Sequence, residues 1–155
     1  MEMPKPSEEH HRLARLSGRW VGEEILHPSP WDPDGGRAKG RMRGRMALGG
    51  FHLILEYEQE RDGKTTFEGH GVLGWDPDEK KYTLHWFDSH GAVEGSPATG
   101  TWEGNVLSLE RESRKQGLGR QVYDATDDEL RFRLEHSRNG REWKPFLEGT
   151  YKRLG

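Results

Sequence analysis

The residues best suited to bind a metal ion or to move protons are histidines and carboxylates, and three of them are spaced along two neighbouring predicted strands. Glu68 and His70 alternate on one strand, and His85 lies on the next. A Glu/His/His set of this kind can hold zinc. We expect all three side chains to point away from the apolar face of the sheet, where a solvated polar residue needs no ion. No metal site is therefore assigned. The absence of cysteine also excludes thiol catalysis.

One glycine motif has the spacing of a nucleotide-binding site but is not followed by the helix that such a site requires. Gly69, Gly71 and Gly74 match the spacing of the dinucleotide-binding fingerprint. That fingerprint needs a helix N-terminus directly after it to bind the phosphates, and the following residues are predicted to form a strand. We therefore expect no nucleotide.

Asp88, Ser89 and His90 are adjacent in the sequence, but neighbours on a strand point to opposite faces and no nucleophile elbow surrounds them. Asp88 is the more interesting residue. If it points inward it must be protonated or paired, and Glu148 and Arg111 are candidate partners whose faces the sequence leaves open. At a strand end it would instead cap the following loop.

These side chains must be positioned by strands, because only one helix is predicted, over about residues 7–17. Ser7 is a suitable N-cap, Glu8 and Glu9 suit the first turn, and Gly18 ends the helix. The rest of the chain shows short apolar-alternating runs between Gly, Pro and Asp, which indicates an all-β barrel or sandwich. The predicted strands cover residues 18–27, 37–48, 51–61, 64–76, 81–88, 98–103, 106–113, 118–125, 129–136 and 143–153. We expect a single domain over residues 1–155, with the barrel over 18–153.

The composition restricts the partners. The net charge of -3 provides no general attraction to nucleic acid. No apolar run is long enough for a transmembrane helix, and the opening MEMPKPSEEHHR lacks the apolar stretch of a signal peptide. The cytoplasm is therefore the expected location.

The run from Arg37 to Leu48 alternates basic residues with small and apolar ones, the period of a strand with one buried face. A hairpin turn at Gly49–Gly50 pairs Arg43 with Glu56 on the outer face. Cross-strand charge pairing then explains the basic stripe better than nucleic-acid binding does.

The next hairpin, around Asp62 and Gly63, is ambiguous by one residue. A two-residue turn would point Glu68 and His70 inward. A turn with Gly63 as a bulge would pair Glu60 with Lys64 instead. We prefer the second register because it buries the inward set Phe67, Gly69, Gly71, Leu73 and Trp75.

Four segments carry a family resemblance: HRLARLSGRWVGE, FEGHGVLGWDP, YTLHWFDSHG and FLEGTYKR. Together they resemble a bacterial family catalogued only as a domain of unknown function. The resemblance spans nearly the whole chain and implies a calycin-like fold, an up-and-down antiparallel barrel of about ten strands related to lipocalins, fatty-acid-binding proteins and haem-binding nitrobindins. It implies no established activity.

The resemblance also suggests two structural residues and one cofactor to test. In lipocalin-type barrels the Trp of Gly-x-Trp plugs one end and an Arg of the last strand packs across it, which here implies Trp20 and Arg153. Haem binding as in nitrobindins needs an axial His near the last strand. Residues 143–153 contain none, and His136 lies at a rim. We predict no cofactor.

We expect the barrel to bind a small apolar or aromatic molecule without catalysis. Glycines on inward faces, such as Gly40 and Gly44, would leave space for it. The predicted ligand-binding residues are Met42, Met46, Tyr57, Phe67, Gly71, Trp75, Tyr82, Trp86 and Asp88.

Two other functions stay open. One is an isomerase or hydrolase that uses Asp88 or Glu148 as its acid and base. The other is an interaction module without a cavity, in which Val72, His85 and Phe87 form a homodimer patch on the outer face.

Overall fold

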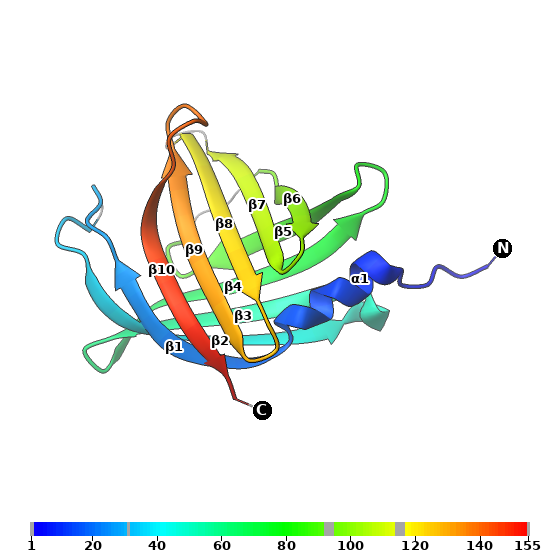
Figure 1. The fold of residues 1–155 in the computed structure, drawn as a ribbon, viewed down its shortest axis with the longest axis horizontal. Coiled ribbons are helices and arrows are strands. Elements are labelled where there is room, and N and C mark those ends of the chain that lie inside the picture. Colours follow the sequence, from blue (N-terminus) through cyan, green and yellow to red (C-terminus); the bar gives the residue numbers. More distant parts are fainter. Residues whose placement is uncertain (1, 31, 92–94, 114–116, 155) are drawn as a thin grey trace.

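The computed structural model is a closed antiparallel barrel in which each strand pairs with its neighbours in the chain and the last strand pairs with the first (Figure 1). It describes residues 2–30, 32–91, 95–113 and 117–154. The strands are β1 (Gly18–Leu26), β2 (Gly36–Ala47), β3 (His52–Arg61), β4 (Lys64–Asp76), β5 (Lys81–Asp88), β6 (Ala98–Glu103), β7 (Val106–Ser113), β8 (Gly117–Ala125), β9 (Glu129–Ser137) and β10 (Lys144–Arg153). The all-β up-and-down barrel predicted from the sequence is confirmed.

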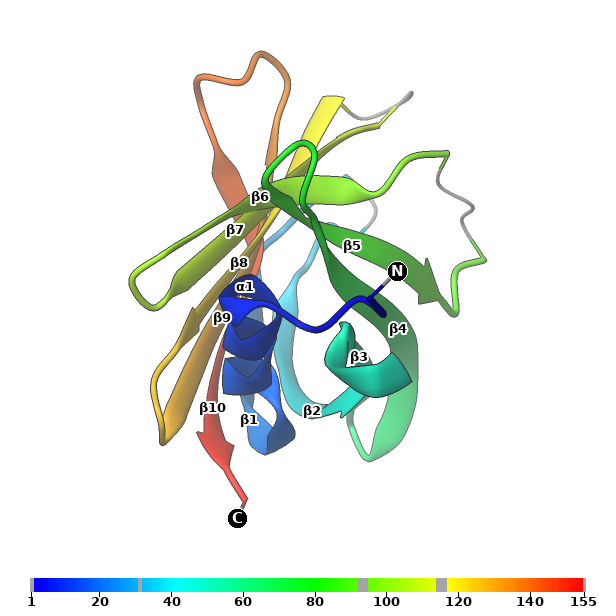
Figure 2. The same cartoon turned by 90° about the vertical axis from the view of Figure 1, so that its right-hand side faces the viewer.

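The N-terminal helix closes one end of the barrel, which we call the helix end (Figure 2). It consists of α1 (Glu8–Arg12) and a 3₁₀ turn over Leu13–Leu16. Leu13 and Leu16 are fully buried because they lie three apart and pack on one face against the barrel core. In the described part of the chain, no helix combines the length and apolar character needed to cross a membrane.

Trp20 and Arg153 form the predicted plug beneath this helix. They are directly paired across β1 and β10, and the Arg153 guanidinium lies 4.1 Å from the centre of the Trp20 ring. The indole N–H donates to the Leu16 carbonyl at 3.2 Å, which ties the strand to the helix. The contact between the two residues is therefore confirmed.

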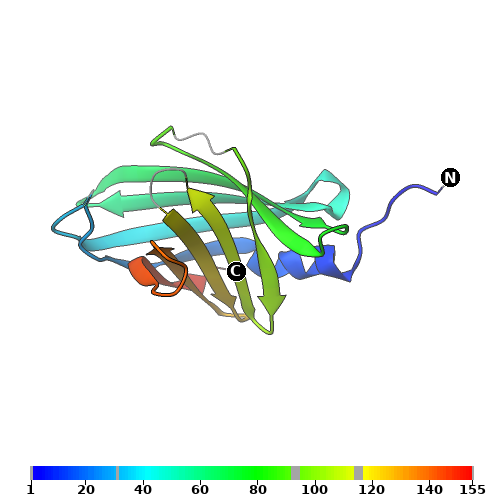
Figure 3. The same ribbon diagram turned by 90° about the horizontal axis from the view of Figure 1, so that it is seen from above.

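Each strand places alternate residues inside and outside the barrel, so the register of strand pairing determines which side chains face the interior. The hairpin of β2 and β3 has the expected register, with Arg43 opposite Glu56 and Met46 opposite Leu53. The outer charges pair across strands, as Arg41 with Glu60 at 3.0 Å. Figure 3 shows the long strands β2 to β4 on one side of the barrel and β7 and β8 crossing obliquely on the other.

The hairpin of β3 and β4 has the predicted faces but not the predicted turn. Arg61 pairs directly with Lys64, so Asp62 and Gly63 form a two-residue turn, both with positive φ. A bulge at Thr66 then shifts the register, because Gln59 pairs with Phe67 while Glu60 pairs with Thr65. The bulge restores the inward set that includes Phe67.

The end of the barrel opposite the helix, which we call the distal end, is less well covered. Inward-facing or core-packed side chains near this end remain partly exposed, whereas Leu53 and Leu73 near the helix end are fully buried. The partly exposed apolar residues at the distal end are Leu26, Phe67, Trp86, Leu134 and Phe146.

Candidate functional site

The most unusual feature of the interior is a fully buried carboxyl group, Glu24 on β1. The Tyr57 hydroxyl from β3 lies 2.8 and 2.7 Å from its two oxygens, and the Tyr151 hydroxyl from β10 bonds to Oε2. The Gln59 amide donates to Oε1 at 3.1 Å and to the Tyr57 hydroxyl at 3.1 Å. We call these four residues the Glu24 cluster.

The strand pattern explains how the cluster assembles. Glu24 lies four residues after Trp20, so strand alternation points both side chains inward. Gly40 on the neighbouring strand leaves room for it, because a Cβ there would overlap the Glu24 carboxylate and approach the Tyr151 ring. The carboxyl therefore occupies volume that a side chain on β2 would otherwise fill.

Burial controls the electrostatics of the cluster. Removal from water raises the pKa of Glu24, and the hydrogen bonds from Tyr151, Tyr57 and Gln59 oppose this in part. Burial and the nearby Glu24 carboxyl raise the pKa of Tyr57 and that of Tyr151 far above the ordinary tyrosine value. Both tyrosines therefore remain neutral hydrogen-bond donors at physiological pH.

Polar contacts continue from the cluster toward the distal end. The exposed Thr66 hydroxyl lies 3.4 Å from the Gln59 side-chain oxygen, so Gln59 lies between Glu24 and the rim. On the opposite wall, the buried Tyr123 donates to the half-buried Gln121 at 2.7 Å. A polar route thus leads from the buried carboxyl to the solvent-accessible end.

The predicted ligand-binding residues divide between the two ends of the barrel. Trp75 and Tyr82 pack together at the helix end, with ring centres 4.8 Å apart, and the Tyr82 hydroxyl donates to the Glu9 carbonyl. Met46 lies at the same end. Met42 is buried in the core next to Trp20. The remaining residues, which lie nearer the Glu24 cluster and the distal end, are Tyr57, Phe67, Gly71, Trp86 and Asp88.

The inward glycines do not leave empty space, contrary to the sequence-based argument. A Cβ on Gly69 would overlap the Trp86 ring, and one on Gly71 would lie 2.9 Å from Leu84 Cδ1 and 3.1 Å from the Trp86 ring. At Gly44 the backbone of Leu16 comes close. These glycines accommodate large neighbouring groups, which is the other role that glycine has inside a sheet.

Asp88 has the capping role considered from the sequence. Its carboxylate accepts the backbone N–H of His90 at 2.9 Å and the indole N–H of Trp86 at 3.1 Å. It therefore holds both the loop after β5 and the Trp86 ring. Glu148 is not a buried partner, because it lies on the outer face and pairs with His27 at 2.9 Å.

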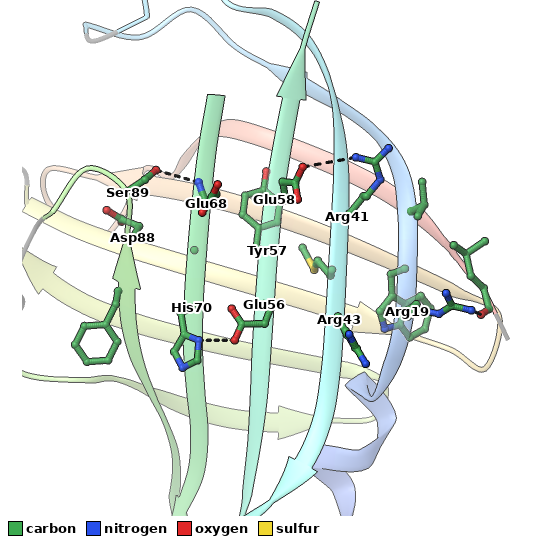
Figure 4. Close-up of a pocket in the computed structure, with 16 residues that line it drawn as sticks. Arg19, Arg41, Arg43, Glu56, Tyr57, Glu58, Glu68, His70, Asp88 and Ser89 are labelled. Atoms are coloured by element: carbon green, nitrogen blue, oxygen red, sulfur yellow. Dashed lines mark hydrogen bonds and ion pairs between the residues drawn. The ribbon is translucent and has the colours of Figure 1, made fainter. Parts of the chain in front are cut away.

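The carboxylate–histidine set lies outside the barrel, as expected. His70 pairs with Glu56 at 2.6 Å, while His85 is exposed. No group of three metal-ligating side chains occurs among the described residues. A groove of about 880 Å³ crosses this outer face, with Arg19, Arg41 and Glu56 among its lining residues (Figure 4).

Sequence reasoning missed Glu24, Gln59 and the role of Tyr151. A usable signal was present: Trp20 was predicted to point inward, and strict alternation then points Glu24 inward too. Gln59 and Tyr57 likewise share a face of β3. What the sequence could not provide is the distance between strands that are far apart in the chain.

Fold and site together define an up-and-down ten-stranded antiparallel barrel with a buried polar cluster in its interior. The chain belongs to the family described as "Protein of unknown function (DUF1579)", whose model matches residues 5–153. Among the curated proteins, none matches this chain.

The crystal structure of Rv2717c from M. tuberculosis is similar to this barrel. The TM-score is 0.72 at 18% sequence identity, over 96% of this chain and 99% of that chain. At this identity the likeness concerns the fold alone.

Proposed function

We propose that the barrel binds a small, largely apolar or aromatic molecule in its interior, without catalysis, and that the molecule enters at the distal end. The observation that carries this proposal is the contrast between the two ends. Among the described residues, five core-packed apolar side chains near the distal end are partly exposed, whereas at the helix end Leu13, Leu16 and Trp20 are fully buried and Met46 and Trp75 are partly exposed. Apolar surface that is held inside a fold yet accessible is typical of ligand sites.

Phe67 and Trp86 form the apolar wall in this proposal. Phe67 packs against Tyr57 with ring centres 5.9 Å apart, and Trp86 covers Gly69 and Gly71 on the neighbouring strand. Asp88 fixes the indole orientation through its hydrogen bond to the ring N–H. A wall held in this way loses little side-chain freedom when a ligand packs against it.

The helix-end residues contribute indirectly. Trp75 and Tyr82 pack against each other beneath the helix and hold the closed end in place. Met42 and Met46 fill the adjacent wall, where their flexible side chains adapt to neighbouring shapes.

The test uses N-phenyl-1-naphthylamine, an uncharged fluorescent probe whose emission rises in apolar surroundings. We expect saturable binding, and Trp86→Ala should weaken it by about tenfold, which corresponds to about 1.4 kcal/mol of lost contact. The matched control is Trp143→Ala, because Trp143 lies against Arg120 at 4.0 Å on the outer face. Absence of saturable binding, or equal loss in both variants, would contradict an interior site.

The same experiment separates the alternative functions. An outer interaction module formed by Val72, His85 and Phe87 would bind the probe through Phe87, which is 56% exposed. Phe87→Ala would then abolish binding and Trp86→Ala would not. Gly71→Leu is a poor test of ligand space, because the leucine would collide with Leu84 and Trp86.

A further inference from the structure

Within the described part of the chain, the hydrogen-bond partners of Glu24 carry no positive charge. The groups that donate to the carboxyl, two tyrosine hydroxyls and one amide, are all neutral. A buried carboxylate is normally stabilised by a cation, because desolvation is costly and neutral hydrogen bonds offset it only in part.

The elements around Glu24 supply few charged groups. β2 presents Gly40, β10 presents Gly149 and Tyr151, and β9 presents Phe132. From β8, Tyr123 faces the same interior.

Three other charged or titratable residues are further from the cluster. Glu23 on β1 points to the outer face. Arg111 and His136 lie on the inner faces of β7 and β9 near the distal end, and both have interactions of their own. Among the residues that the structure describes, the groups that hydrogen-bond to Glu24 are therefore all neutral.

Gln59 occupies the position that a ligand nitrogen would take. Its amide N–H₂ lies between the Glu24 carboxyl and the Tyr57 hydroxyl, 3.1 Å from each. On its distal side, the Gln59 oxygen faces the exposed Thr66 hydroxyl at 3.4 Å. A side-chain rotation of Gln59 toward the rim would remove the amide donor from Glu24 Oε1, so that a group arriving from the distal end could donate to this oxygen in its place.

We propose that the barrel selects aromatic or apolar ligands that carry a protonated amine, and that the ammonium group binds Glu24 in place of the Gln59 amide. This inference rests on the proposed function and adds the chemical class of the ligand. An ammonium group supplies both the N–H donors that Gln59 now provides and the charge that the cluster lacks. The aromatic faces of Tyr57 and Phe67 also favour a cation.

The same arrangement discriminates against anions. A ligand carboxylate would meet Glu24 without an adjacent cation, and like charges in a desolvated site repel strongly. A neutral alcohol would be accepted but would gain no charge neutralisation. The expected order of affinity is amine, then alcohol, then carboxylate.

The test compares three probes with one aromatic body: 1-naphthylmethylamine, 1-naphthalenemethanol and 1-naphthoate, titrated by calorimetry at pH 7.5. The amine should bind about tenfold more tightly than the alcohol, a difference of about 1.4 kcal/mol. Glu24→Gln should lower the amine affinity to about that of the alcohol and so abolish this difference. The exposed Glu23→Gln, one residue away, is the matched control and should retain the preference.

Gln59→Ala tests the displacement directly. It removes the amide that competes for the carboxyl, so amine affinity should rise by about threefold, or about 0.7 kcal/mol. Circular dichroism establishes that each variant is folded. A fall in amine affinity would show that Gln59 supports the ligand and would overturn the displacement.

Failure of the inference and failure of the proposed function give different results. Equal binding of all three probes, or tightest binding of the naphthoate, overturns the amine preference but leaves an apolar interior site intact. If none of the three probes nor the uncharged probe binds, both proposals are wrong. A preference for the amine that survives Glu24→Gln overturns the assignment to Glu24.

Discussion

At the scale of single residues, the burial of the Glu24 carboxyl is costly to the fold. A fully buried carboxyl loses its hydration, and its three neutral donors recover only part of that free energy. A methionine or leucine of similar volume would be the cheaper choice if packing alone mattered. The burial of this carboxyl is therefore not explained by stability alone, which is consistent with the recognition role that we propose for it.

The pH dependence of stability tests the burial of Glu24. Its pKa in the folded state is raised above the ordinary value of 4.5, so the folded protein binds more protons than the unfolded chain between these two values. The free energy of unfolding of the wild type, relative to Glu24→Gln, should therefore fall as the pH rises from about 4.5 through the folded-state pKa. The fall amounts to about 1.4 kcal/mol for each pH unit that separates the two pKa values.

Urea unfolding curves for the wild type and the variant across this pH range measure the difference. The control is Glu23→Gln, an exposed carboxyl on the same strand, for which the difference should stay flat. If the difference in unfolding free energy between the wild type and Glu24→Gln also does not change with pH, the Glu24 carboxyl is hydrated in the folded protein.

At the scale of strands, most boundaries were predictable because they follow local signals. Turn residues and period-two alternation placed β4 over residues 64–76 and β5 over 81–88, as the structure has them. The pairing of Trp75 with Tyr82 also followed from one short loop. These features depend on residues that are near one another in the sequence.

The hairpin of β3 and β4 shows where local reasoning fails. The predicted inward faces are correct, but the structure reaches them in a different way. A two-residue turn at Asp62–Gly63 shifts the register by one residue relative to the prediction, and a bulge at Thr66 shifts it by one more, which restores the predicted faces. A bulge with no glycine leaves no clear sequence signal, so burial was the better guide. The Glu24 cluster could not be predicted from local sequence signals, because Glu24 and Tyr151 are separated by most of the chain and meet only when the barrel closes.

The packing of Trp86 over two glycines gives a prediction for β4 and β5. Gly69→Ala should destabilise the protein by about 1–3 kcal/mol, because its methyl group would overlap the indole. In a Trp86→Ala background the same change should cost much less. The interaction energy from this double-mutant cycle, measured by urea unfolding, should exceed about 0.5 kcal/mol. Additive effects would mean that the ring lies elsewhere.

At the scale of the whole molecule, the barrel is asymmetric along its axis. One end is covered by the helix and by the plug that joins the first strand to the last, while the other end has more partly exposed apolar side chains. In the function that we propose, the helix end provides stability and the distal end receives the ligand. Arg153 strengthens the seal by donating to the carbonyls of Ser17, Arg15 and Asp127.

Trp20 should therefore contribute to the stability of the entire barrel. Its side chain is 0% exposed and contacts the helix, the core and Arg153 at the same place. Trp20→Ala should lower the free energy of unfolding by about 3–5 kcal/mol, the usual range for truncation of a buried tryptophan. Phe87→Ala is the matched aromatic control on the outer face and should cost about 0.5 kcal/mol or less. Urea unfolding monitored by far-ultraviolet circular dichroism measures both. A loss below about 1 kcal/mol for Trp20→Ala would show that the barrel closes without its plug, and the seal would then have to come from Leu13 and Leu16.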